Sequence, residues 1–208
     1  KKIRSTIILD AGRLFNISEK KLINICAAVE CIHSYSLIHD DLPCMDNDAI
    51  RRGKPSTHIK YGEASAVLAG SSLLTLAFEI IADKKYKLNS KFKNEIIYSL
   101  AYCSGHTGIA GGQELDLKFE NKKKNISKII DMQKKKTGKL FNFCLYAVGV
   151  IANQNKKEKF FLSNLGEEIG LLFQLSDDFL DIKSTKKLTG KQVKKDSKQG
   201  KSTLLNLL

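Results

Sequence analysis

The sequence predicts an all-α protein that folds as an antiparallel helical bundle around a central cavity. Three observations support this fold class. Apolar residues recur at helical spacing along most of the chain, no alternating pattern indicates a strand, and there are only two prolines. With 208 residues, 42% of them hydrophobic, the chain can bury one sizeable core. We therefore expect a single domain over residues 1–208.

Apolar segments separated by short polar stretches give the expected helices in chain order. They cover residues 7–15, 27–39, 63–83, 92–104, 129–133, 140–152 and 156–182. Ser18, Ser90 and Ser127 precede three of them and are the expected N-caps. The segment 63–83 is mostly apolar, so we expect it to be buried on most sides. Lys136-Thr137-Gly138 interrupts the pattern and indicates a local break that exposes backbone carbonyls.

The densest group of charges covers residues 39–54. It contains His39, Asp40, Asp41, Asp46, Asp48, Arg51, Arg52 and Lys54. Asp40 ends an apolar helix, where the helix dipole disfavours carboxylates unless a cation lies among them. Pro43 prevents regular continuation, so a loop can bring Asp46 back to Asp40. This pattern favours a divalent cation on the Asp oxygens with Arg51 and Arg52 on a phosphate; a solvated charged loop is the alternative.

A second acidic cluster follows the last long apolar segment. Residues 173–182 read FQLSDDFLDI, and Asp177 and Asp181 are four residues apart, so one helix face presents both. Two such clusters, each ending an apolar helix, are far less common than a single Asp pair. Their pairing favours a metal site between helices over two solvated loops.

Composition narrows the possible partners. No uninterrupted apolar run reaches the roughly 18 residues of a transmembrane helix, so we expect no membrane insertion. Five cysteines without CxxC spacing favour a reducing compartment, such as the cytoplasm or a plastid, and no zinc site. The net charge of +13 permits a polyanionic partner. Because the lysines are scattered and lack interleaved aromatics, we do not expect nucleic-acid binding.

The motifs resemble those of the trans-isoprenyl diphosphate synthases. HDDLPCMD with NDAIRRGKPSTH is similar to the first aspartate-rich motif of that family, and QLSDDFLD with LTGK and GKSTL is similar to the second. KKIRS at the start, GGQELDL at 111–117 and KTG at 136–138 extend the resemblance over nearly the whole chain. The sequence departs from the family pattern at Lys2, Ser5, Ser71 and Leu205.

The resemblance implies a role for each matching residue. Magnesium, as three ions per site, would be held by Asp40, Asp41, Asp46, Asp177, Asp178 and Asp181. Substrate diphosphates would be bound by Lys1, Arg4, His33, Arg51, Arg52 and Lys201. Lys136, Thr137, Gln174 and Lys191 would assist catalysis, and Gln113 and Asp116 would point toward the metal region. Lys183 to Gly200 would form a lid over the phosphates.

The implied reaction joins isopentenyl diphosphate to an allylic diphosphate, dimethylallyl or geranyl, and makes farnesyl diphosphate. Tyr35 lies five residues before Asp40, about 7.5 Å down the helix axis, where a large ring would be a floor for the growing chain. Geranylgeranyl or geranyl diphosphate is the alternative product. The family also implies a homodimer and further helices at both ends of the chain.

Three other functions have weaker support in the sequence. An inactive partner subunit of a synthase should have lost aspartates, whereas both clusters are present here. A metal-dependent terpene cyclase of related fold would not be expected to carry the Arg51–Arg52 pair. A basic nucleic-acid binder would show salt-dependent retention of nucleic acid during purification.

Overall fold

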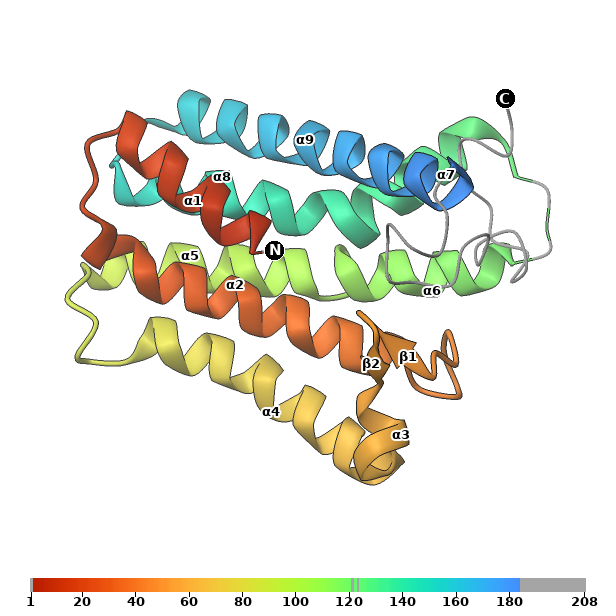
Figure 1. Cartoon of the computed structure of the whole chain (residues 1–208). Helices are drawn as coiled ribbons and strands as arrows, with labels where there is room; N and C mark the ends of the chain where they lie inside the picture. The colour runs from red at the N-terminus through yellow and green to blue at the C-terminus, as the bar shows by residue number, and fades with distance from the viewer. Residues whose placement is uncertain (1, 121, 123, 184–208) are drawn as a thin grey trace.

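The computed structural model describes residues 2–120, 122 and 124–183, and in that part it is almost entirely helical (Figure 1). The helices are α1 (Ile3–Leu14), α2 (Glu19–Asp40), α3 (Thr57–Tyr61), α4 (Glu63–Ala82), α5 (Ser90–Ser104), α6 (Ile109–Phe119), α7 (Ile126–Gln133), the π-helical turn η1 (Lys134–Gly138), α8 (Lys139–Ile151) and α9 (Lys156–Lys183). The all-α prediction is confirmed.

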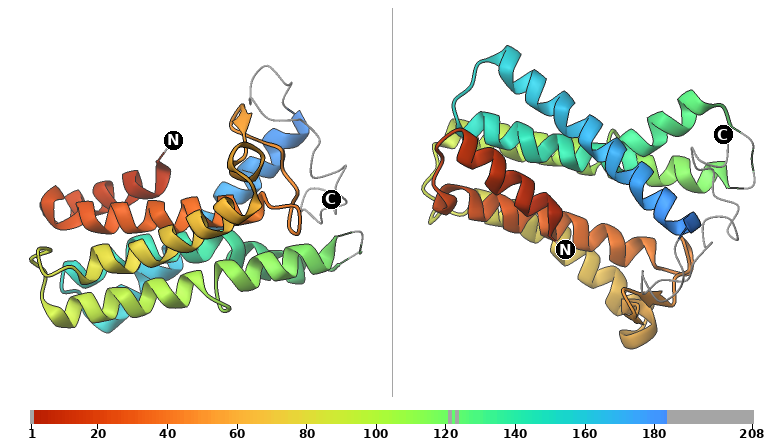
Figure 2. Two further views of the ribbon diagram at one scale, coloured as in Figure 1. Left: turned by 90° about the horizontal axis from the view of Figure 1, so that it is seen from below. Right: turned by 45° about the horizontal axis from the view of Figure 1, so that its top comes forward.

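The long helices pack side by side along one bundle axis (Figure 2). α2 packs against α1 and α4, and α8 packs against α9, α5 and α1. Fully buried side chains of this core include Ile25, Val29, Ile32, Leu100 and Phe143. The apolar residues that recur at helical spacing therefore form one apolar interior shared by several helices, as expected.

The two acidic clusters lie at the same end of the bundle. α2 and α9 both run toward the end that carries the hairpin and α7, so the aspartates near their C-termini belong to the same end of the bundle (Figure 1). Carboxylates at two helix C-termini face the unfavourable ends of two helix dipoles. Positive charge at this end of the bundle is therefore stabilising, and basic side chains on the hairpin and on η1 provide part of it. The cavity expected between the clusters stays a prediction.

A short hairpin is the exception to the all-helix expectation. β1 (Ile50–Arg51) and β2 (Lys54–Pro55) pair antiparallel, with Arg51 opposite Lys54. Arg52 and Gly53 form the two-residue turn with positive φ, 53° and 76°. Strands of two residues are too short to show an alternating pattern, so periodicity could not predict this hairpin.

Two expected N-caps are wrong by one or two residues. Asn89, rather than Ser90, caps α5 by accepting a hydrogen bond from the backbone N–H of Lys91. Asn125, rather than Ser127, does the same for α7. Asn and Ser are about equally good caps, so propensity did not separate the candidates. Ser18 does occupy the N-cap position of α2, although its side chain makes no capping hydrogen bond.

The expectation that residues 63–83 are buried on most sides is wrong. In α4 only Ala66, Gly70, Ala77 and Ile81 are buried, whereas the apolar side chains of Val67 and Leu68 are exposed. In the described part, α2 and α4 are long and apolar enough to cross a membrane by length and composition alone. Buried core helices meet the same criterion, and α2 is one.

The break predicted at Lys136-Thr137-Gly138 is a π-helical turn between α7 and α8. Gly112 of α6 lies directly against it: a Cβ on Gly112 would stand 2.2 Å from the backbone N of Lys136. Only glycine allows this approach, because any side chain would overlap the backbone of η1. α6 and η1 are thereby held together at the end of the bundle that carries the aspartates.

Candidate functional site

The loop after α2 returns as the sequence predicted. The backbone N–H of Asp46 donates to the carbonyl of Asp40 at 2.8 Å, and the N–H of Asp48 donates to the carbonyl of Asp41 at 3.0 Å. Pro43 in the loop between them ends the regular helix. These two backbone bonds fold the acidic segment into one compact turn at the end of α2.

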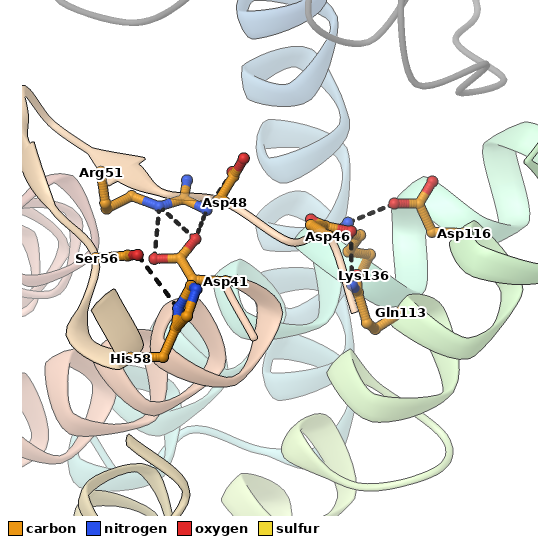
Figure 3. A network of polar contacts seen from close by, with 9 residues as sticks. All are labelled: Asp41, Asp46, Asp48, Arg51, Ser56, His58, Gln113, Asp116 and Lys136. Carbon is orange, nitrogen blue, oxygen red and sulfur yellow. Dashed lines mark hydrogen bonds and ion pairs between the residues drawn. The ribbon is translucent and has the colours of Figure 1, made fainter. Parts of the chain in front are cut away.

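Arg51 is bound by this turn rather than directed at solvent. Its Nε donates to Asp41 at 3.0 Å (Oδ1) and 3.3 Å (Oδ2), its Nη2 also bonds Asp41, and Nη2 donates to Asp48 at 3.2 Å (Figure 3). Asp41 is 3% exposed. The structure thus places the predicted phosphate ligand Arg51 on the predicted metal ligand Asp41, and the two neutralise each other.

Lys136 brings positive charge to the other side of the site. Its Nζ donates to Asp116 of α6 at 2.5 Å (Figure 3). Burial alone would lower the pKa of Lys136, but the carboxylates of Asp116, Asp40 and Asp46 outweigh burial and raise it. Gln113, also on α6, donates to Asp46 at 3.3 Å. Lys136 is therefore close to the first aspartate cluster, and Gln113 and Asp116 point toward it.

The side-chain amides of two glutamines connect the second cluster to the junction of α7 and η1. Asp178 is buried and accepts from Gln174 at 2.8 Å and from Gln133 at 3.0 Å. Thr137 in turn donates to Gln174 at 2.7 Å. The predicted catalytic pair Thr137 and Gln174 is therefore in direct contact. Gln133, which the sequence analysis did not single out, has no motif of its own and emerges only from the three-dimensional contacts.

A basic group forms where α1, α2 and the hairpin turn meet. Burial, followed by the charges of Arg4, Arg52 and Arg51, lowers the pKa of His33 to about 3. Arg4 is 8% exposed and its guanidinium lies 4.8 Å from the ring of Phe141. Burial is also the main cause that lowers the pKa of Arg4, while the charge of Asp177 raises it. Three predicted substrate ligands thus lie together near the second cluster.

Three buried side-chain atoms in the described part have no hydrogen-bond partner: Arg4 Nε, Gln113 Oε1 and Gln133 Oε1. All three belong to residues around the two clusters. One is a donor suited to an anion, and two are hard oxygen acceptors of the kind that suit magnesium and its hydration shell. Within the described part, no three His, Cys, Asp or Glu side chains lie close enough to hold a metal together. The donor chemistry fits magnesium, although the predicted ligands are not gathered around one point.

Tyr35 lies in the core beneath the first cluster. It is 8% exposed, its hydroxyl donates to the carbonyl of Ser104 at 3.4 Å, and its ring packs edge-on against His39. His39 is also bonded to the carbonyl of Val67 at 3.1 Å, so it ties α2 to α4. Burial is the first cause that raises the pKa of Tyr35. Tyr35 is thus a buried ring one and a half turns below Asp40, the depth expected of a floor.

The remaining predicted site residues are two aspartates of α9 and three lysines. Asp177 is exposed on α9, and Asp181 lies in the last turn of that helix, where only its backbone is described. Lys1, Lys191 and Lys201 lie outside the described residues, as does most of the predicted lid. Their predicted roles stay predictions.

Comparison with known proteins agrees with this geometry. The family model for polyprenyl synthetase matches residues 1–208. The chain belongs to the polyprenyl synthetase family. It is 40% identical over 211 residues to the farnesyl diphosphate synthase of Escherichia coli, covering 100% of this chain and 70% of that protein. It is 38% identical over 209 residues to the farnesyl diphosphate synthase of Bacillus subtilis, covering 100% and 71%.

A solved structure of a polyprenyl synthetase relative shows the same architecture. The geranyltransferase of Helicobacter pylori, complexed with magnesium and isoprenyl diphosphate, superposes with a TM-score of 0.89 at 35% identity, covering 99% of this chain and 69% of that one. These findings confirm the resemblance and the fold class predicted from the sequence. As a polyprenyl synthetase, the protein is a prenyl transferase.

The lowered pKa of His33 predicts a dependence of stability on pH. The pKa is about 3 in the folded chain and about 6.5 when unfolded, so the unfolded chain binds the proton first as pH falls. Stability due to neutral His33 is therefore present above about pH 6.5 and lost progressively toward pH 3. Between pH 7.5 and 5, the free energy of unfolding of the wild type should fall by about 1–2 kcal/mol more than that of His33→Gln. Urea unfolding at the two pH values measures this difference.

His106 provides the matched control, because its side chain is exposed on the surface. His106→Gln should leave the slope of stability against pH as in the wild type. Equal slopes for wild type and His33→Gln would contradict the inferred burial of neutral His33 beside Arg4 and Arg52.

Proposed function

We propose that this polyprenyl synthetase condenses isopentenyl diphosphate with dimethylallyl or geranyl diphosphate and makes farnesyl diphosphate. The C–O bond of the allylic diphosphate breaks, and the diphosphate leaves with the bonding electrons. The double bond of isopentenyl diphosphate attacks the allylic carbon. Loss of one proton, to the released diphosphate, forms the new trans double bond.

One observation carries this proposal beyond the family membership: two aspartate clusters and a basic group share one end of the bundle. Asp40 and Asp46 lie on one side with Lys136 among their charges, and Asp177 lies on the other near Arg4. Two diphosphates carry several negative charges that must be held close together. Separate acidic and basic groups at one site suit a cation-bound diphosphate beside a second, directly bound one.

The basic group is the better candidate for isopentenyl diphosphate. Arg4 Nε is a buried donor without a hydrogen-bond partner among the described residues, and Arg4, His33 and Arg52 influence one another electrostatically. Arg51 is held by Asp41 and Asp48, so it contributes charge and fixes the hairpin that carries Arg52. Neutral His33 can both donate to and accept from a bound phosphate.

The acidic side is the better candidate for the allylic diphosphate. Asp40, Asp46 and Asp177 would hold magnesium, which when bound neutralises the leaving diphosphate; three ions per site are part of this proposal. Lys136 is kept protonated by its carboxylate neighbours. It adds fixed positive charge where negative charge develops as the C–O bond breaks. Thr137 and Gln174 fix η1 against α9 at the same place.

We further propose that the synthase is a homodimer that pairs through α4 in a reducing compartment such as the cytoplasm. Leu68 is 67% exposed, and Val67 and Leu76 of the same helix are exposed as well. Large exposed apolar side chains on one helix favour contact with another protein surface. A second copy of this chain offers the same face and closes with two-fold symmetry.

The metal sites are tested by removing one carboxylate from each cluster. We expect Asp40→Ala and Asp177→Ala to lower kcat by about 100-fold or more, because each removes a magnesium ligand and thus several kcal/mol of charge stabilisation. The measurement is turnover of isopentenyl and geranyl diphosphate at saturating magnesium. Asp10→Ala is the control, since Asp10 is exposed on α1 and pairs only locally with Arg13 among the described contacts. Wild-type turnover in either cluster variant would refute the two-cluster mechanism.

Product length is tested at Tyr35. If its buried ring is the floor of the chain-elongation space, Tyr35→Ala should shift the main product from fifteen carbons to about twenty or more. Products are sized by chromatography after incubation with dimethylallyl and isopentenyl diphosphate. Tyr86→Phe tests a buried tyrosine whose hydroxyl donates to the backbone carbonyl of Lys21 at 2.6 Å, and it should leave product length unchanged. An unchanged spectrum for Tyr35→Ala would mean that Tyr35 only fills the core.

A further inference from the structure

Gln133 occupies an unusual position at the junction of α7 and η1. It is 4% exposed, and its Nε2 donates to Oδ2 of Asp178 at 3.0 Å. The other carboxylate oxygen, Oδ1, accepts from Gln174 at 2.8 Å. Each oxygen of Asp178 therefore has its own amide donor, and the two donors come from different segments of the chain. A buried carboxylate held at both oxygens has little freedom to rotate.

The contacts form a two-step ladder between the α7–η1 junction and α9. Gln133, the last residue of α7, pairs with Asp178, and Thr137 of η1 pairs with Gln174 at 2.7 Å. Gln133 and Thr137 are four residues apart, as are Gln174 and Asp178, so the two pairs lie on matching faces. Lys136 of η1 bonds instead to Asp116 on α6. The α7–η1 junction thus holds α9 through Gln133 and Thr137, and α6 through Lys136.

The second polar atom of the Gln133 amide is not used by this ladder. Its Oε1 is buried and has no hydrogen-bond partner among the described residues. The orientation is fixed, because the NH₂ group must face the carboxylate of Asp178 and the carbonyl then faces away. Leaving a buried carbonyl unpaired costs about 1–3 kcal/mol, and a donor that arrives with a ligand would recover it. The aspartate clusters and the basic group at this end of the bundle suit a hydrated cation with a diphosphate.

We propose that Gln133 is a positioning residue for the acidic cluster of α9, an inference that rests on the proposed function. Its N–H holds Asp178, which fixes the last turns of α9 and with them Asp177. Its carbonyl accepts a hydrogen bond from the hydration shell of magnesium diphosphate. Binding at the α9 cluster is thereby coupled to η1, the segment that also carries Lys136.

The test replaces Gln133 by side chains that differ in these two hydrogen bonds. Gln133→Met keeps the size but removes donor and acceptor. Gln133→His keeps one N–H donor and one acceptor nitrogen. Gln154→Met is the matched control, because Gln154 lies in the α8–α9 connection and its side-chain amide donates to the nearby carbonyl of Ala152. The probe is inorganic diphosphate with magnesium, and its affinity is measured by titration calorimetry alongside the magnesium dependence of turnover.

For Gln133→Met we expect about 10-fold or more weaker binding of magnesium diphosphate and a similar rise in the magnesium concentration for half-maximal turnover. Gln133→His should return both to within about threefold of wild type. Lower thermal stability with unchanged binding would overturn the proposal, since a purely structural residue gives that result. If Gln133→Met does not fold, Gln133→Asn, whose shorter amide cannot reach Asp178, takes its place; wild-type binding would then overturn the proposal.

Calorimetry separates this inference from the proposed function. A wild-type protein that binds magnesium diphosphate but forms no prenyl product would refute the proposed reaction and leave the Gln133 comparison valid. A wild-type protein that does not bind magnesium diphosphate would overturn both. Normal turnover with equal magnesium dependence in wild type and Gln133→Met would overturn only the role of Gln133.

Discussion

The need for positive charge among clustered carboxylates determines the arrangement of this end of the bundle. α2 and α9 both end with aspartates at the same end of the bundle, and both helix dipoles oppose negative charge there. Positively charged side chains of the protein itself balance these carboxylates. Lys136 lies among the charges of Asp116, Asp40 and Asp46, and Arg51 lies between Asp41 and Asp48. Without these two side chains, mutual repulsion would push the loop at 41–49 away from the helices.

The backbone provides the places from which these cations reach the carboxylates. Lys136 stands on a π-helical turn, and Gly112 lets α6 approach that turn closely enough for Asp116 to bond it. π-helical turns are often found at functional sites because they redirect side chains within a continuous helix. Arg51 stands on a two-residue strand whose tight turn places Arg52 beside His33 and Arg4. Local backbone irregularities thus position both cations.

The sequence predicted most of the helices and the paired aspartate clusters, because periodicity and clustered charge are local signals. The return of Asp46 to Asp40 was also predictable, since Pro43 stops the helix between them. The pairing of Arg51 with Asp41 was not, because charges near one another in sequence do not reveal which of them pair after folding.

Gln133 was missed for a different reason: its partner Asp178 is on another helix, and a lone glutamine carries no signal. The exposed face of α4 was missed because apolar composition alone does not distinguish a core from an interface.

The internal cations also determine which carboxylates remain responsive to a ligand. Asp41 is neutralised by Arg51 through several hydrogen bonds, and Asp116 holds Lys136 at 2.5 Å. Asp40 and Asp46 also act on Lys136 through their charges, which are weaker causes of its raised pKa than the charge of Asp116. A divalent cation that approached Asp40 and Asp46 would therefore compete with Lys136 for two partners and leave its bond to Asp116 intact. Lys136 would stay protonated and anchored while the cation is bound, so its charge would add to that of the cation when a diphosphate must be stabilised.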